Sequence, residues 1–589
     1  MDYAYEAGVD SDSSRLTSLS GPRTSTTTAA TLEAFKYLGA GTVIERSRPE
    51  VNVTLSMTSL SGTVGDAGDK YTGLDRFGRV VDQRWTKGTT PTSAVVDRST
   101  STYDRNSNRL TRTNVLAAAF SETYAYDALN QLTSFSRGGG TTTSQQWQFD
   151  ALGNPTTVTT NAVVQSRTAN AQNEVTQVGG STLGYSSAGN LTTDELGRNL
   201  VYDAWNRLVS VRNSANTEIA RYEYDGLHRR IIGLVGTPAA PSAAAAPVRD
   251  VYYSQDWQVL EERRRTAAGA IPATADTRFI WSPVYVDALI ARDRDADGSG
   301  TTGTGGLEQR VYALQDANWN TTAIVAAAGV PGVAAGNVIN RFVYTPYGES
   351  QTLTASWTKP AAGSTPATPW AHLFQGLEQT SMTGLSQARN RQYSPSLGRF
   401  IQLDPIGFQA GDNNWYRFVG NAPTGRTDPS GLHRYRLGGK HPGDHSRVCV
   451  DMYDSQGNKT GQQYCCSLEA QDGSGGSESF GSGSRGSRRA LTHSTWCTDI
   501  SLGAAMIGLW RHPAAILCGP TALTPKEKAN QRVESSRQED EKLLKSLMQE
   551  NGSPTTWNGA ISNCHQYALS RLYVGLNPAC LPRGNRREW

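Results

Sequence analysis

The 589-residue chain is long enough for several domains; 37% of its residues are hydrophobic, 59 are glycines, and the formal net charge is +3. So small an excess of positive charge gives no reason to expect a nucleic-acid partner. The most apolar stretch, residues 500–510, is too short for a membrane span, which needs about 20 residues.

The chain opens with MDYAYEAG, which has neither a basic start nor an apolar run, so no signal peptide is visible. This opening looks like the inside of a degenerate repeat. We therefore expect residues 1–70 to be a degenerate or incomplete part of the region that follows, in a protein produced in the cytoplasm.

A tyrosine or phenylalanine followed by aspartate recurs through the next part of the chain, in places every 22 or 23 residues. A fixed period of this length predicts one small unit stacked many times. Alternating aromatics before the aspartate, such as Tyr124 and Tyr126, predict a strand, and the aspartate followed by Asn or Gly predicts a turn into a second strand. Each repeat should be a β-hairpin, which is stable only when stacked. The repeats are YDRNSNRL (103–110), YDALNQL (126–132), FDALGN (149–154), YDAWNRL (202–208) and YDGLHR (224–229).

Farther along, residues 293–298 read DRDADG, the opening of a calcium-binding loop. Asp293, Asp295 and Asp297 are the candidate ligands, and Ca²⁺ is the one cofactor that the sequence suggests. The twelfth position of the loop, Thr304, lacks the acidic residue that such loops use, and a solvated hairpin tip explains the motif as well.

The composition changes abruptly at Leu432, because all seven cysteines follow it. The block before it is rich in Tyr, Gly and Asp. A chain that changes character at one point is expected to carry two functions. The marked motifs of the block are RNRQY (389–393), GRF (398–400), DPIG (404–407) and DPSGL (428–432).

These repeats and this block resemble the YD-repeat, or Rhs, family, whose repeats form a teneurin-like shell. The resemblance implies a mainly β fold: a cocoon-like shell of YD-repeat β-hairpins with a small α+β C-terminal domain. It places the shell in residues 1–371, an Rhs repeat-associated core with a self-cleavage motif in 372–432, and an effector or polymorphic-toxin-type domain in 433–589.

Two aspartates of the core, Asp404 and Asp428, each begin an Asp-Pro turn. If the core folds back on itself they can meet, and close carboxylates cannot both ionise easily, which leaves one base and one acid. The resemblance implies that this pair cuts the chain after the DPSGL motif, between Leu432 and His433. Arg399 is the candidate for orienting the pair or balancing its charge. The alternative is that both aspartates only cap turns.

The C-terminal part is predicted to begin with two strands, 447–453 and 460–468, and to continue after a Gly/Ser-rich linker at 473–486. The pattern of residues 526–550 predicts a helix, and a last helix is expected to open at residue 562.

Cys564 falls in the first turn of that last helix, where the helix dipole lowers the pKa of a thiol. His445 is the candidate base for such a nucleophile. The arrangement is similar to circularly permuted papain-like hydrolases, which would map their cysteine onto Cys564 and their histidine onto His445. The third polar residue stays open among Gln462, Gln463 and His565.

The sequence thus predicts a toxin of bacterial competition, secreted or delivered as an effector, whose C-terminal segment is a cysteine hydrolase freed by aspartyl autoproteolysis. Its expected partners are a cognate immunity protein and a secretion apparatus or shell-completing chain. Two alternatives stay open: a structural or adhesion YD-repeat protein of the cell surface without catalytic activity, and a tail that is a nuclease or an ADP-ribosyltransferase.

Overall fold

The computed structural model describes residues 2–5, 15–21, 30–38, 42–57, 73–88, 93–237, 240, 242–243, 247–298, 306–361, 368–432, 435–436, 447–453, 459–467 and 490–491. The chain divides into two compact units. The larger unit consists of Met1–Ala4, Ser18–Lys36 and Val43–Gly439, and it contains all the repeats. The other unit is formed mainly by Lys440–Trp589.

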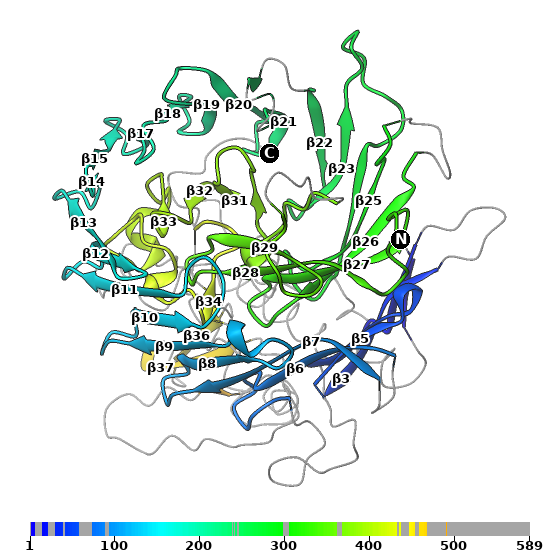
Figure 1. Ribbon diagram of the computed structural model, residues 1–589. Helices are drawn as coiled ribbons and strands as arrows, with labels where there is room; N and C mark the ends of the chain where they lie inside the picture. Colours follow the sequence, from blue (N-terminus) through cyan, green and yellow to red (C-terminus); the bar gives the residue numbers. More distant parts are fainter. Residues whose placement is uncertain are drawn as a thin grey trace. The chain divides into compact units, whose positions relative to one another are not determined.

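Two large sheets build the larger unit, and in each of them neighbouring strands are consecutive in sequence (Figure 1). Their paired strands run antiparallel, as predicted for stacked hairpins. The first sheet holds β1 (Asp2–Ala4), β2 (Ser18–Ser20), β3 (Thr31–Leu38), β4 (Thr42–Arg48), β5 (Val53–Ser56), β6 (Asp82–Lys87), β7 (Ala94–Tyr103), β8 (Arg109–Asn114), β9 (Glu122–Tyr126), β10 (Leu132–Arg137), β11 (Ser144–Phe149), β12 (Pro155–Thr160), β13 (Val163–Ala169), β14 (Val175–Val178) and β15 (Ser181–Thr182). The second holds β16 (Gly184–Tyr185), β17 (Leu191–Thr193), β18 (Asn199–Tyr202), β19 (Leu208–Arg212), β20 (Glu218–Tyr224), β21 (Arg230–Val235), β22 (Arg249–Tyr253), β23 (Val259–Arg264), β24 (Thr277–Trp281), β25 (Leu289–Arg294), β26 (Gln309–Gln315), β27 (Thr321–Ala328), β28 (Val338–Tyr344) and β29 (Ser350–Thr354).

The YD motif owes its form to hydrogen bonds inside each turn. Asp225 Oδ1 accepts from the backbone N–H groups of Leu227 and Arg229, both at 2.9 Å, and its Oδ2 accepts from Arg229 Nε at 2.7 Å. The hydroxyl of Tyr224 donates to the carbonyl oxygen of Leu208 at 2.8 Å, which ties the repeat to the one before it. The predicted β-hairpin repeat is confirmed. Equivalent aspartate turns occur at Asp75, Asp127, Asp150, Asp194 and Asp203.

The early strands of the first sheet pack on the late strands of the second. Trp85 of β6 is 1% exposed and shares a core with Tyr312 of β26. Polar contacts reinforce this packing, since Trp85 Nε1 donates to the carbonyl oxygen of Gln315 at 3.2 Å and Arg341 Nη2 donates to that of Val96 at 2.9 Å. The beginning and the end of the repeat region are therefore held together by one interior.

Three charged side chains are buried inside that interior. Glu33 accepts from Arg46 Nε at 3.0 Å and lies 3.6 Å from Arg48 Nε. The guanidinium of Arg48 lies over the ring of Trp85, at 4.7 Å from its centroid, and donates to the carbonyl oxygen of Ala313 in β26. Burial lowers the pKa of Arg48 to about 10, against the opposing effect of Glu33.

The block after the repeats forms a small sheet, β30 (Glu378–Gln379), β31 (Ser386–Ala388), β32 (Arg391–Ser394) and β33 (Arg399–Phe400), and a two-stranded one, β34 (Arg426–Thr427) and β35 (Tyr435–Arg436). Short 3-10 turns also occur in it, η5 (Phe374–Gly376), η6 (Gly407–Ala410) and η7 (Val419–Asn421), as they do earlier in the chain, η1 (Pro49–Val51) and η3 (Ala118–Phe120).

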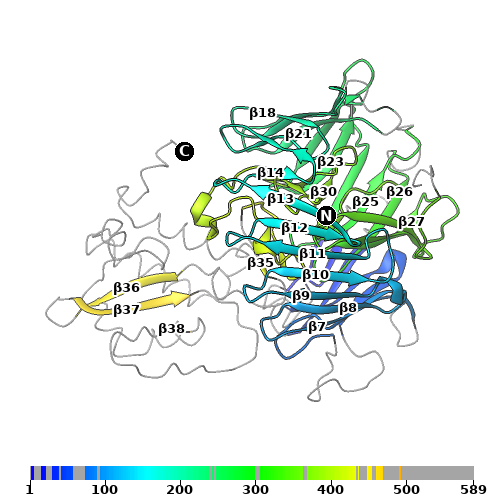
Figure 2. The ribbon, with the colours of Figure 1, turned by 60° about the vertical axis from the view of Figure 1, so that its left-hand side comes forward.

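This block, residues 372–432, is packed against both large sheets. Leu397 and Ile401 share a core with strands of both sheets, including Val175 of β14 and Leu200 of β18. The side chain of Tyr416 is fully buried, and its hydroxyl donates to the carbonyl oxygen of Gly189, in the turn between β16 and β17, at 2.7 Å. Figure 2 shows β30 and its neighbours beside strands of both large sheets.

In the C-terminal part, β36 (Arg447–Tyr453) and β37 (Lys459–Ser467) form an antiparallel pair, and β38 (Ala490–Leu491) is parallel to β37. The first two correspond to the predicted strands, while the predicted helices lie outside the described residues. The part of the chain that the structure describes contains no helix long and apolar enough to cross a membrane.

The two large antiparallel sheets confirm the predicted mainly β shell.

Candidate functional site

Asp404 and Asp428 lie in two turns of the core block. The Oδ1 atom of Asp404 accepts from the backbone N–H of Ile406 at 3.1 Å, and its own N–H donates to the carbonyl oxygen of Trp415 at 3.1 Å. Asp428 directly follows β34. Only 6% of Asp404 and 3% of Asp428 is exposed. Buried carboxylates require a charge partner or hydrogen-bond donors.

That partner is one arginine, Arg391, at the start of β32. Its Nη2 atom lies 2.8 Å from Asp404 Oδ2 and 3.6 Å from Asp428 Oδ2. Its Nη1 donates to the carbonyl oxygen of Trp415 at 2.8 Å, and its Cζ is 3.6 Å from the ring centroid of Phe400. Burial lowers the pKa of Arg391 to about 10, while the two carboxylates oppose that change. A single guanidinium nitrogen thus brings together the two aspartates that the sequence singled out.

The chain just before the predicted cut is hydrogen-bonded to one member of the pair, Asp428. Asp428 Oδ1 accepts from the backbone N–H of Leu432 at 3.2 Å and from the hydroxyl of Ser430 at 3.1 Å. The Ser430 oxygen in turn accepts from the Leu432 N–H at 3.1 Å. The residue on the N-terminal side of the bond therefore contacts one member of the pair directly. His433, on the other side, lies outside the described residues.

Arg399 is placed elsewhere, contrary to the expectation that it orients the aspartates. Its Nη2 donates to the carbonyl oxygen of Asn173 at 2.7 Å and to the Oδ1 of Asn414 at 3.3 Å. Its guanidinium lies 4.9 Å from the ring centroid of Tyr416. Arg399 thus joins the core to the repeat sheet, and the position between the carboxylates belongs to Arg391.

Sequence reasoning did not assign a role to Arg391 or Ser430, although both stand in motifs that it marked. All four residues of β32 are buried, and a buried arginine requires acidic partners, but this burial is seen only in the structure.

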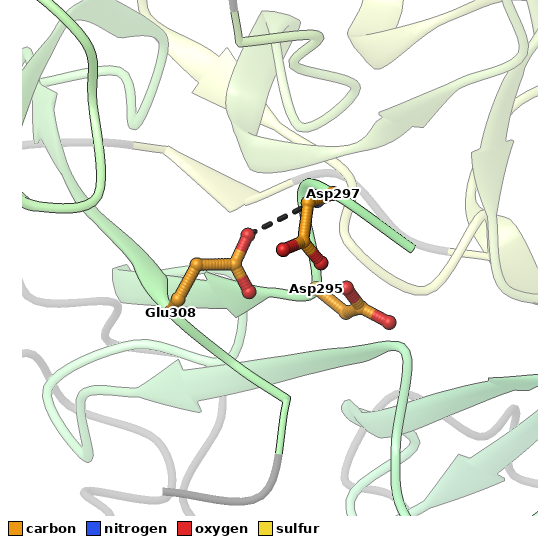
Figure 3. A group of neighbouring side chains, drawn as sticks. All are labelled: Asp295, Asp297 and Glu308. Carbon is orange, nitrogen blue, oxygen red and sulfur yellow. Dashed lines mark hydrogen bonds between the residues drawn. The ribbon is translucent and has the colours of Figure 1, made fainter. Parts of the chain in front are cut away.

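The candidate calcium loop is also rearranged relative to the prediction. Asp295, Asp297 and Glu308 each offer one oxygen within 4.8 Å of the others (Figure 3). Asp293 is not one of these ligands, because its two carboxylate oxygens accept from Arg310 at 2.6 and 2.8 Å. Glu308 takes its place and also accepts from the backbone N–H of Asp297 at 3.1 Å. Calcium binding stays a prediction.

The candidate residues of the C-terminal enzyme, Cys564, His445 and His565, lie outside the described residues. Gln462 and Gln463 lie in β37, whose backbone alone is described. The cysteine-hydrolase assignment therefore stays a prediction from the sequence.

Comparison with known proteins agrees with the YD-repeat shell seen in the structure. Residues 66–237 match the teneurin YD-shell family. The tRNA3(Ser)-specific nuclease WapA of Bacillus spizizenii is 26% identical over 316 residues, which cover 52% of this chain and 12% of WapA. The double-stranded DNA deaminase toxin A of Burkholderia cenocepacia is 26% identical over 257 residues, covering 42% of this chain and 16% of the toxin.

Among solved structures, the crystal structure of TcdB2-TccC3 superposes with a TM-score of 0.54 at 20% identity, covering 73% of this chain and 21% of that one. At this identity the likeness concerns the fold. Together the matched repeats and the shared fold define a β shell built from YD repeats. The repeat region of this chain is thus a β shell similar to the teneurin YD-shell, and the chain spans only 12% of WapA and 16% of the deaminase toxin.

Proposed function

We propose that this chain is the shell and core of an Rhs-type toxin, and that its core cuts the chain between Leu432 and His433. The observation that supports the cut most directly is the placement of Asp404 and Asp428 on one guanidinium nitrogen of Arg391, with the Leu432 N–H bound to Asp428. Two buried carboxylates beside a peptide bond provide the base and the acid that hydrolysis requires.

The reaction consumes one water molecule. One carboxylate takes a proton from the water molecule. The oxygen of that water molecule attacks the carbonyl carbon of Leu432. The bond between that carbon and the nitrogen of His433 breaks, and the other carboxyl group supplies a proton to the leaving nitrogen. The products are a carboxyl group on Leu432 and a free amine on His433, and the proton taken up by the first carboxylate replaces the one that the other carboxyl group gave away.

The test is intact-mass measurement of the purified wild-type chain beside Asp404→Asn and Asp428→Asn. We expect two wild-type fragments that meet between Leu432 and His433, and one uncut chain for each variant. An uncut wild type, or a variant that is still cut at this bond, would reject the aspartate mechanism. An uncut chain would favour a structural or adhesion protein.

The segment released by this cut is the effector in our proposal, delivered into a target cell and neutralised in the producer by an immunity protein. Its proposed nucleophile and base are Cys564 and His445. Expression of residues 433–589 should be toxic and Cys564→Ala should remove the toxicity, since the thiolate would be the attacking group.

A second candidate activity for this segment is suggested by the names of two relatives, which act on tRNA and on double-stranded DNA. If the segment is a nuclease or a nucleic-acid deaminase, the Cys564→Ala variant stays toxic. Incubating the purified segment with tRNA and with double-stranded DNA would then show strand breaks or base changes.

A further inference from the structure

The two-residue turn of Arg389 and Asn390, which joins β31 to β32, lies against the segment that precedes the proposed cut. Three successive residues of the turn and of β32 donate hydrogen bonds to three successive carbonyl oxygens of that segment. Each of residues 389–391 thus binds one carbonyl oxygen of residues 429–431, in chain order. The pairs are Arg389 Nη1 to Pro429, Asn390 N and Nδ2 to Ser430 (3.2 and 3.0 Å), and Arg391 Nε to Gly431.

Arg389 is itself held by a residue of the repeat region. Its Nη2 and Nη1 donate to the two carboxylate oxygens of Asp287, at 2.7 and 3.2 Å. Asp287 is 5% exposed and lies in the connection between β24 and β25. A paired guanidinium has a fixed plane, so Asp287 sets the direction in which Arg389 presents its donor to Pro429.

The segment is recognised through its main chain, and it approaches the turn closely at one glycine. Gly431 has a φ of +68°, and a Cβ at this position would collide with the carbonyl oxygen of Ala388. A side chain would therefore push the segment off the turn. The contacts to Pro429 and Ser430 go to their carbonyl oxygens.

We propose that Arg389 and Asn390 are positioning residues for the self-cleavage. With Arg391 they hold the carbonyls of residues 429–431 in a fixed register, and this places the bond after Leu432 beside Asp404 and Asp428. The inference rests on the proposed cleavage and deepens it. Neither residue takes part in proton transfer: their effect is the gain in rate that comes from holding the reacting bond in place.

The test follows the full chain, labelled by a short pulse in a cell-free translation reaction, and measures the fraction cut over time. Arg389→Ala should slow cleavage by about 100-fold, the size that misplacement of a reacting group can reach. Arg389→Lys should recover part of the rate, because it keeps a cation and a donor. Millimolar guanidinium, well below denaturing concentrations, should accelerate Arg389→Ala and leave the wild type unchanged.

Arg310→Ala is the matched control, since Arg310 also binds an aspartate, Asp293, through two hydrogen bonds at 2.6 and 2.8 Å. It should cut at the wild-type rate. Melting temperatures of both alanine variants are compared in the Asp428→Asn background, where no cut interferes, and we expect similar values.

The outcomes separate the two proposals. Wild-type cutting with no loss in Arg389→Ala would overturn the positioning role and leave the aspartate mechanism standing. A slow Arg389→Ala that guanidinium does not accelerate, with a melting temperature far below that of Arg310→Ala, would also overturn it, because the residue would then be structural. A wild type that is never cut would overturn both.

Discussion

Glu33 and Arg48 form an ion pair of 3.6 Å in which neither side chain has any exposed surface. Arg46 binds the same carboxylate, so two guanidinium groups share one counter-charge inside the interior that joins the first strands to the last. Removing that charge would leave two buried cations without a counter-charge.

Glu33→Gln should therefore lower the free energy of unfolding by roughly 3–5 kcal/mol, the cost of breaking a buried ion pair. The control is Glu45→Gln, because Glu45 pairs at 2.8 Å with Lys36, whose side chain is 69% exposed, and exposed pairs contribute less than about 1 kcal/mol. Urea unfolding of both variants measures the difference. Equal effects would show that the buried pair does not stabilise the interior shared by the first and last strands.

Arg391→Lys should slow self-cleavage by about 100-fold. A lysine retains the charge but cannot bind Asp404, the carbonyl oxygen of Gly431 and that of Trp415 at once. The cut fraction is measured over time beside Arg417→Lys, another core arginine, which binds Asp412 at 2.8 Å. A wild-type rate in Arg391→Lys would mean that the guanidinium geometry is not needed.

Gly431→Ala should also slow cleavage strongly, because a methyl group would displace the segment before the cut. Gly384→Ala is the matched control. Gly384 has the same φ of +68° but nothing within 4 Å of an added Cβ, so it tests backbone strain without the collision. Strain of this kind costs about 1–3 kcal/mol. If both variants cut equally fast, the close approach at Gly431 has no role in the reaction.

Arg399→Met should lower stability by about 2 kcal/mol or more, since it removes charged hydrogen bonds between the core and the repeat sheet. The folded protein should still be cut at the wild-type rate, because Arg399 binds Asn173 and Asn414. Melting temperature and cut fraction are measured on the same sample. A variant that is stable but uncut would show that Arg399 is needed for the cleavage.

His372 should make the shell less stable in acid. Its ring is enclosed by Phe279 and Trp281, at 4.9 and 5.4 Å between centroids, and burial lowers its pKa from 6.5 to about 4. Between these two values the unfolded chain binds a proton that the folded chain does not. Stability therefore falls as the pH decreases through this window, by roughly 3 kcal/mol in total.

His372→Phe should remove this contribution. Melting temperatures at pH 7.5 and pH 5 should differ less for the variant than for the wild type. An unchanged difference would assign the acid sensitivity to other groups.

The repeat hairpins were predictable because each aspartate binds the backbone and the side chain of its own turn, as Asp225 does with Arg229. Such bonds are local in sequence, so the motif carries them. The turns that hold Asp404 and Asp428 were predictable for the same reason, whereas the idea that the two carboxylates meet came from the resemblance to the Rhs family.

Contacts that depend on strand register were not predictable. Asp293 stands directly opposite Arg310 in the pairing of β25 with β26. In this register Asp293 is not part of the acidic cluster, and Glu308 joins Asp295 and Asp297 instead. Arg391 reaches Asp404 and Asp428 only after the core has folded. The sequence motifs alone therefore could not show which arginine, Arg391 or Arg399, binds the two aspartates.

The proposed cut falls in the connection between β34 and β35. These strands pair through Arg426 with Arg436 and Thr427 with Tyr435, so residues on both sides of the bond belong to one small hairpin. Hydrolysis would open the hairpin loop and leave its ladder intact. Release of the C-terminal segment would therefore need a second step after hydrolysis, in which β35 separates from β34.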